Sequence, residues 1–139
     1  MIYTSPVPIE NVDYVWKRCA PLLKKATDRS KGRESIESLY AKIKNETSRL
    51  WCISIGPYIV GSATTEVVQY ANYKSLNVSF LGGSKMNLWL DKFIEELKVY
   101  SKFNNCSSIE LIGRKGWLRS LNPFGFKEED HITMSLMLE

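Results

Sequence analysis

The sequence predicts a single α/β domain over residues 1–139, of the α+β kind in which helices flank a mixed sheet. Three observations predict it. Apolar residues recur at helical spacing through the first third of the chain, and from Leu50 the spacing becomes that of strands. Residues 75–112 have the pattern of strand, helix and strand that joins a parallel pair. A chain of 139 residues, 44% of them hydrophobic, can bury roughly two thirds of its unfolded surface in one core.

The first third of the chain predicts one short strand and two helices. Residues 2–3 are expected to be extended, and a helix follows from about Ile9. Pro21 lies inside this helix and is expected to kink or break it. After a polar loop, Ser35 offers an N-cap oxygen to a second helix. The apolar residues at helical spacing are Val12, Val15, Trp16, Cys19, Leu22, Leu23 and Ala26 in the first helix, and Ile36, Leu39, Tyr40 and Ile43 in the second.

The middle of the chain predicts three antiparallel strands. Residues 50–55, 58–69 and 75–81 are rich in β-branched and aromatic side chains. Gly56-Pro57 and residues 70–73 separate these segments at hairpin length. The third segment alternates apolar and polar side chains, so we expect one of its faces to be buried.

The last third predicts the crossover helix and two further strands. Residues 85–104 carry a continuous apolar face and form the strongest helical pattern in the chain. Residues 107–112 follow as a short apolar strand, parallel to the one before the helix. A short helix over residues 114–121, a turn at Asn122-Pro123 and a final strand over residues 131–138 complete the expected elements.

Composition excludes several classes of protein. No apolar run approaches the roughly 20 residues that a membrane helix needs, and the first residues lack the pattern of a secretory signal, so a cytoplasmic location is expected. Cys19, Cys52 and Cys106 form no metal-binding motif, and with a single histidine we expect no metal site. A net charge of +4 is too small to define a nucleic-acid binder.

Positive charge is nevertheless concentrated in one stretch. Seven lysines and arginines fall within residues 17–33, and Asp28 is the only acidic residue in this stretch. We interpret this stretch as a solvated helix face, and contact with nucleic acid through Lys24, Lys25, Arg29 and Arg33 is the weaker alternative.

The order of elements resembles the Gcn5-related N-acetyltransferase (GNAT) fold along essentially the whole chain. The stretch GRKGW at residues 113–117, leading to Phe124-Gly125-Phe126, is similar to the segment that follows the fifth strand of that family. It is also similar to small bacteriophage GNAT-like proteins with a GR(R/K)GW-type stretch at this place. The resemblance implies a mixed sheet of about six to seven strands flanked by about four helices.

The resemblance also implies where acetyl-CoA would lie. In the family it occupies a V between the fourth and fifth strands, and backbone amides at the start of the next helix hold its pyrophosphate. Glycines there let the backbone approach phosphate, and an open helix N-terminus attracts anions. The corresponding residues here are Gly82, Gly83, Ser84 and Lys85, with Arg114 and Trp117 as further contacts. They depart from the family's (Q/R)-x-x-G-x-(G/A) pattern, and the alternative is a plain turn with Ser84 as N-cap.

The family's catalytic residues are largely missing. Its tyrosine, which often protonates the departing thiolate, corresponds to Leu121, which has no proton to donate. A general base must be a carboxylate or histidine within hydrogen-bond reach of the amine. Glu66 is the only acid in the three predicted antiparallel strands and is therefore the candidate. The alternative for Glu66 is a surface glutamate paired with a lysine or serine of a neighbouring strand.

Two functions follow from this mixture. The favoured interpretation is a phage GNAT-like protein that has lost acetyl-CoA chemistry and acts as a virion, assembly or host-interaction factor, with a phage or host protein as its partner and no cofactor. It would then lie in the host cytoplasm or in the virion. The alternative is an N-acyltransferase that uses acetyl-CoA, has an atypical pyrophosphate loop and uses Glu66 as its base.

Overall fold

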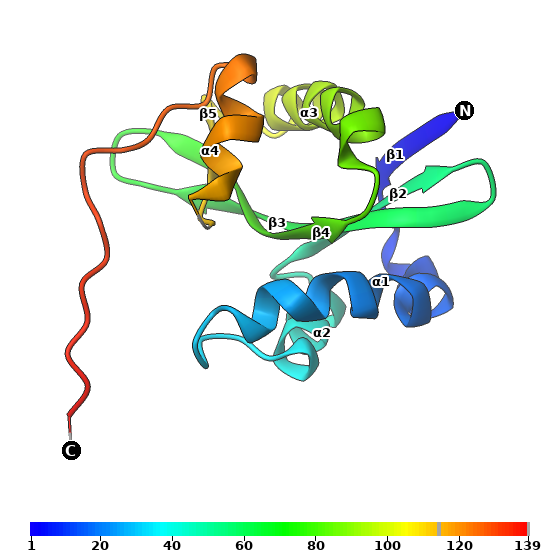
Figure 1. The fold of residues 1–139 in the computed structure, drawn as a ribbon, viewed down its shortest axis with the longest axis horizontal. Coiled ribbons are helices and arrows are strands. Elements are labelled where there is room, and N and C mark those ends of the chain that lie inside the picture. The colour runs from blue at the N-terminus through cyan, green and yellow to red at the C-terminus, as the bar shows by residue number, and fades with distance from the viewer. Residues whose placement is uncertain (114, 139) are drawn as a thin grey trace.

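The computed structural model describes residues 1–113 and 115–138 and has the expected α+β fold, a mixed sheet with helices on both faces (Figure 1). The elements are β1 (Ile2–Pro6), η1 (Ile9–Asn11), α1 (Val12–Asp28), α2 (Ile36–Lys44), β2 (Arg49–Ile55), β3 (Tyr58–Gln69), β4 (Lys74–Gly83), α3 (Met86–Phe103), β5 (Ser108–Leu111), α4 (Gly116–Leu121) and η2 (Asn122–Phe124). The strands lie in chain order. Neighbours from β1 to β4 are antiparallel, and β5 is parallel to β4, so the predicted hairpins and crossover are confirmed.

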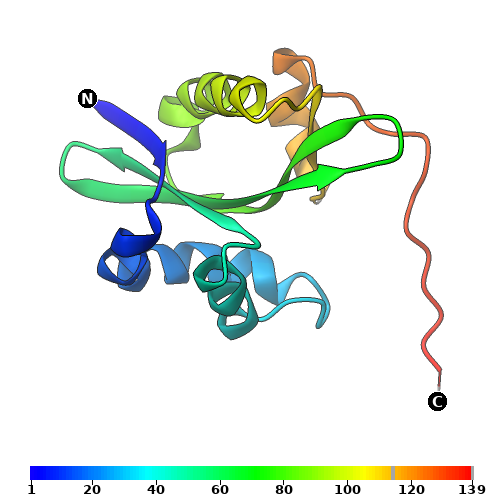
Figure 2. The ribbon, with the colours of Figure 1, turned by 180° about the vertical axis from the view of Figure 1, so that it is seen from behind.

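The sheet separates two hydrophobic cores. Figures 1 and 2 show α1 and α2 against one face and α3 against the other. Along β2 the side chains alternate between them: Trp51 and Ile53 pack under α3, whereas Leu50 and Cys52 pack under α1 and α2. The sheet is therefore covered on both faces, and its positions for ligands are the edges and the ends of its strands.

The two N-terminal helices differ from the prediction in one respect. α1 continues through Pro21 without a break. Proline cannot donate to the carbonyl of Lys17, four residues earlier, and because both residues are exposed, water can take that bond. α2 begins as predicted, with Ser35 as its N-cap: the Ser35 hydroxyl accepts from the Ser38 amide (3.0 Å), and the Ser38 hydroxyl accepts from the Ser35 amide (2.9 Å).

The predicted strand over residues 131–138 is wrong. These residues form no strand in the structure, and the sheet has five strands rather than six to seven. A strand forms only where a neighbouring backbone takes its hydrogen bonds, and the segment runs away from the body of the molecule (Figures 1 and 2). Its apolar side chains are exposed, from 72% for Ile132 to 88% for Leu138. None of the described helices is long and apolar enough to cross a membrane.

Candidate functional site

β4 and β5 part from each other halfway along β4. Their pairing covers four residues of each strand and ends at Val78 opposite Leu111, while β4 continues to Gly83. Residues 79–83 of β4 therefore lie past the end of β5, and the helix α3 begins just beyond them. We call residues 79–83 together with Ile112 and Gly113 the β4–β5 wedge.

Glu66 lies next to the apex of this wedge. It projects from β3 opposite Asn77 and is half-buried. The Ser79 hydroxyl donates to Oε2 of Glu66 at 3.1 Å, which is the pairing with a serine of a neighbouring strand that the alternative for Glu66 predicts. Ser79 is the first residue of β4 past its last partner in β5, and it also has no register partner in β3, since Thr64 pairs with Phe80 and Thr65 with Val78. This bulge accounts for the close approach of Ser79 to Glu66, because an extra residue bends the strand locally.

A lysine of α2 adds positive charge near Glu66. Lys42 forms an ion pair with Glu34 (2.9 Å), and this contact is the largest cause of the raised pKa of Lys42. Burial lowers that pKa, and the charge of Glu66 raises it further. Glu66 is thus a carboxylate flanked by a hydroxyl on one side and an ammonium farther away, an arrangement able to accept a proton from a bound amine.

Gly82 and Gly83 have a packing role that the sequence pattern did not reveal. A Cβ on Gly82 would lie 2.1 Å from the backbone oxygen of Leu22 in α1, and one on Gly83 would lie 2.4 Å from the backbone oxygen of Val60. Gly83 also has a positive φ of 150°. Both glycines are therefore required by the close contact of β4 with α1 and β3, whatever they do toward a ligand.

The start of α3 has no side-chain cap. Its N-cap is Lys85, in the left-handed conformation (φ 58°), and not Ser84, so that expectation is corrected. Ser84 is engaged elsewhere: its amide donates to Val60 (2.8 Å) and its carbonyl accepts from the Trp89 indole (2.7 Å). No side chain caps the helix. The first amides of α3 therefore remain as donors for an anion.

Trp117 lines a different hollow. A pocket of about 890 Å³ lies between β5, the C-terminal half of α3, α4 and the start of the C-terminal segment, and Trp117 is part of its wall. The ring also contacts Gly113, where a Cβ would be 2.8 Å from its Cδ1. None of residues 82–85 lines this pocket. Glu66 and residues 79–83 thus do not line this pocket, whereas Ile112 and Gly113, the other arm of the wedge, line it together with Trp117. Arg114 lies outside the described residues.

Sequence reasoning missed Ser79. Its alternation with Ser75 and Asn77 was visible, but the bulge that turns it toward Glu66 depends on the register between β3 and β4. Among residues 1–113 and 115–138, no three histidine, cysteine, aspartate or glutamate side chains gather as a metal site would require.

Comparison with known proteins identifies the fold. No protein-family model and no curated protein sequence matches the chain. Solved structures do match. They include a predicted acetyltransferase with acetyl-CoA from Clostridium acetobutylicum (TM-score 0.69, 13% identity, 98% of this chain and 96% of that one). They also include a ribosomal-protein-alanine N-acetyltransferase from Brucella melitensis (TM-score 0.72, 10% identity, 100% of both chains) and a GCN5-related N-acetyltransferase from Ralstonia eutropha (TM-score 0.71, 10% identity, 98% and 99%). At these identities the likeness establishes the GNAT fold alone.

Proposed function

We propose that this protein is an N-acyltransferase that uses acetyl-CoA as donor and an amine as acceptor. One observation carries the proposal: the carboxylate of Glu66 is hydrogen-bonded to Ser79, the first residue of β4 beyond its last partner in β5. Glu66, the only acid of strands β1 to β4, thus lies beside the apex of the wedge. In the family that the chain resembles, the corresponding wedge holds the thioester. The likeness to solved acetyltransferases, one of them with acetyl-CoA, supports the same reading.

The wedge offers two kinds of contact to such a donor. Residues 79–83 present one edge of an extended backbone that β5 does not cover, and a ligand with amide groups can pair with such an edge as a strand would. The open N-terminus of α3, with Lys85 at its cap, offers amides and positive charge to phosphate groups. The two contacts follow each other along the chain, as the two ends of a long nucleotide thioester require.

Glu66 supplies the chemistry of the acceptor side. Bound acetyl-CoA would bring the reactive thioester carbonyl. Glu66 would take the proton of the attacking amine, directly or through one water, while the Ser79 hydroxyl holds the carboxylate in place. As the new C–N bond forms and the C–S bond breaks, the thiolate leaves. Leu121 cannot protonate it, so we assign that proton to water, and positioning of the two reactants carries most of the rate.

A second function is favoured by the packing of the glycines. Leu22 packs against Gly82, and Val60 and Trp89 pack against Gly83, so that neither position has room for a side chain. The presence of both glycines therefore needs no bound phosphate to explain it. The scaffold interpretation, a phage-type protein that binds a phage or host protein and no longer binds acetyl-CoA, needs nothing more from them. It predicts an unoccupied wedge at any concentration of acetyl-CoA.

Binding and turnover separate the two functions. Calorimetric titration with acetyl-CoA should give a saturable heat, and a panel of amines should release free CoA thiol in a colorimetric assay. Glu66→Gln should keep the affinity for acetyl-CoA and lose about 100-fold or more in turnover. Glu95→Gln, an exposed glutamate of α3 paired with Lys98, is the matched control and should change neither. Absence of saturable binding by the folded protein would refute the acyltransferase and leave the scaffold.

A further inference from the structure

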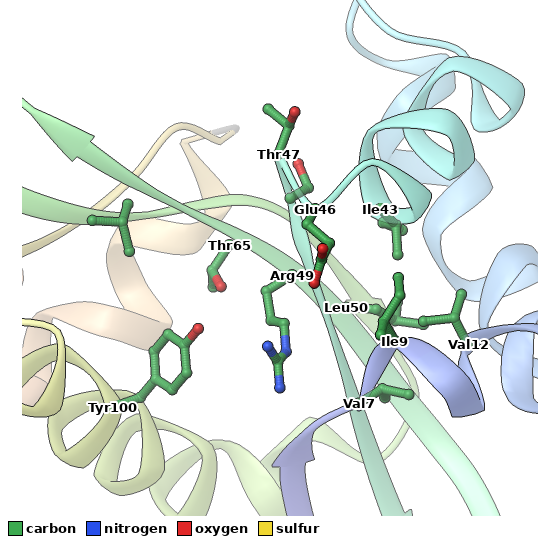
Figure 3. A pocket seen from close by; sticks show the side chains of 12 residues that line it. Val7, Ile9, Val12, Ile43, Glu46, Thr47, Arg49, Leu50, Thr65 and Tyr100 are labelled. Atoms are coloured by element: carbon green, nitrogen blue, oxygen red, sulfur yellow. The ribbon is translucent and has the colours of Figure 1, made fainter.

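A cavity of about 260 Å³ lies at the corner of the sheet where β1 ends (Figure 3). β1 pairs with β2 only up to Pro6 opposite Trp51. Beyond that point the Val7 amide still donates to the Leu50 carbonyl (2.7 Å), and the chain then turns into η1. The first two residues of β2, Arg49 and Leu50, are thus left at an open corner of the sheet. None of the residues that line the cavity belongs to the β4–β5 wedge.

One side of the cavity carries hydrogen-bond donors and a positive charge. In Figure 3 the Arg49 guanidinium lies beside the Tyr100 ring, in the space between β2 and α3. Within the described part of the chain Arg49 forms no ion pair, and the Tyr100 hydroxyl forms no hydrogen bond. The Tyr100 ring is held edge-on against buried Trp51, with ring centroids 5.2 Å apart. Ring packing thus holds Tyr100 in place, and its hydroxyl stays available to a ligand.

Two buried hydroxyls also line the cavity. Thr65 accepts a hydrogen bond from the Trp51 indole (2.9 Å), and its own proton is left to donate. Ser48 is only 3% exposed, and its hydroxyl has no partner among residues 1–113 and 115–138. A buried hydroxyl without a partner destabilises the fold. A polar group bound in the cavity would remove that cost.

The other side of the cavity is aliphatic. Val7, Val12, Ile43 and Leu50 are buried parts of the core under α1 and α2, and Ile9 packs against them. The volume is below the roughly 300 Å³ at which sites for drug-sized ligands begin. The occupant that fits both sides therefore has one anionic group and only a few carbon atoms.

We propose that this cavity binds a small organic monocarboxylate. The planar guanidinium of Arg49 matches a carboxylate in a two-pronged contact, which an ammonium cannot reproduce. Tyr100, Thr65 and Ser48 donate to the remaining lone pairs, and the short alkyl chain lies against Val7 and Ile43. Glu46 also lines the cavity, and its negative charge repels every anion, a dianion or polyanion more strongly than a monocarboxylate. The proposal does not depend on the acyltransferase function, because neither Glu66 nor the wedge takes part.

The test uses the full chain and three probes: sodium butyrate, its neutral analogue butyramide, and sodium sulfate. Two-dimensional NMR titration should show saturable shifts of the backbone amides of Arg49, Leu50 and Thr65 with butyrate and none with butyramide or sulfate. Arg49→Gln should weaken butyrate binding at least tenfold, Arg49→Lys less, and Ser48→Ala a few-fold. Arg119→Gln, which removes an exposed arginine of α4, is the control and should bind like the unmodified protein.

Three outcomes would overturn the proposal. They are the absence of saturable shifts with butyrate, equal shifts with butyramide or sulfate, and unchanged affinity in Arg49→Gln. Arg49 is exposed, so its substitution should leave the fold intact. If it does not, the butyrate shifts of the unmodified protein and the effect of Ser48→Ala decide the question.

Discussion

Replacement of Gly82 by alanine should destabilise the protein through a clash between two backbones. The new Cβ would lie 2.1 Å from the backbone oxygen of Leu22 and 3.1 Å from its carbonyl carbon, whereas ordinary contacts begin near 3.4 Å. A backbone oxygen inside α1 cannot rotate away as a side chain can, so the helix must shift by about an ångström. Overpacking of a core usually costs 1–3 kcal/mol, and we expect about 3 kcal/mol here.

Urea unfolding measures this loss directly. With a slope of about 2 kcal/mol per molar urea, a loss of about 3 kcal/mol lowers the unfolding midpoint by about 1.5 M. Gly116→Ala is the matched control, since its Cβ would meet nothing within 4 Å and Gly116 has no positive φ. Its midpoint should stay the same or rise slightly. A Gly82→Ala midpoint equal to that of the control would refute the packing role given to this glycine.

Three further results are expected. Ser35→Ala removes the capping box of α2 and should cost about 1 kcal/mol in urea unfolding. Trp89→Phe removes the indole bond to Ser84 and should lower the melting temperature by a few degrees. The hydrogen bond from Tyr40, followed by that from Lys44, lowers the pKa of Asp13. Asp13 therefore stabilises the fold above its unfolded-state pKa, and stability falls as acid protonates it. Tyr40→Phe should unfold with a weaker pH dependence below about pH 5, measured by denaturation at each pH.

Most of the fold was predictable because its elements satisfy local rules. The helical spacing that ends at Ile43 and the strand-rich stretch from Leu50 specify where helices give way to strands. The parallel placement of β5 followed from a single helix between two strands, since such a crossover admits few alternatives. These features depend on residues close together in the chain, and a single sequence contains that information.

The features that failed depend on partners elsewhere in the molecule. The alternation of Ile132, Met134 and Leu136 is typical of a strand, yet no neighbouring strand receives this segment and its side chains stay exposed. Pro21 was expected to kink or break the first helix, and α1 has no break there. The N-cap at Lys85 reflects the use of the Ser84 amide in the sheet.

The candidate site shows the same division. Glu66 could be singled out as the candidate general base because it is an acid among the apolar and small residues of a central strand. The sequence offered a paired surface glutamate as the alternative. Its contact with Ser79 arises from a bulge between Thr64 and Thr65, and its closeness to the wedge arises from the length by which β4 exceeds β5. Neither the bulge nor the difference in strand length can be predicted from the spacing of residues along the chain.

The most direct test of acetyl-CoA binding at the wedge is hydrogen exchange of backbone amides with and without acetyl-CoA. We expect slower exchange confined to residues 79–87, where the uncovered edge of β4 leads into the open start of α3. Exchange there that is unchanged at saturating acetyl-CoA, or protection found only at other elements, would contradict it.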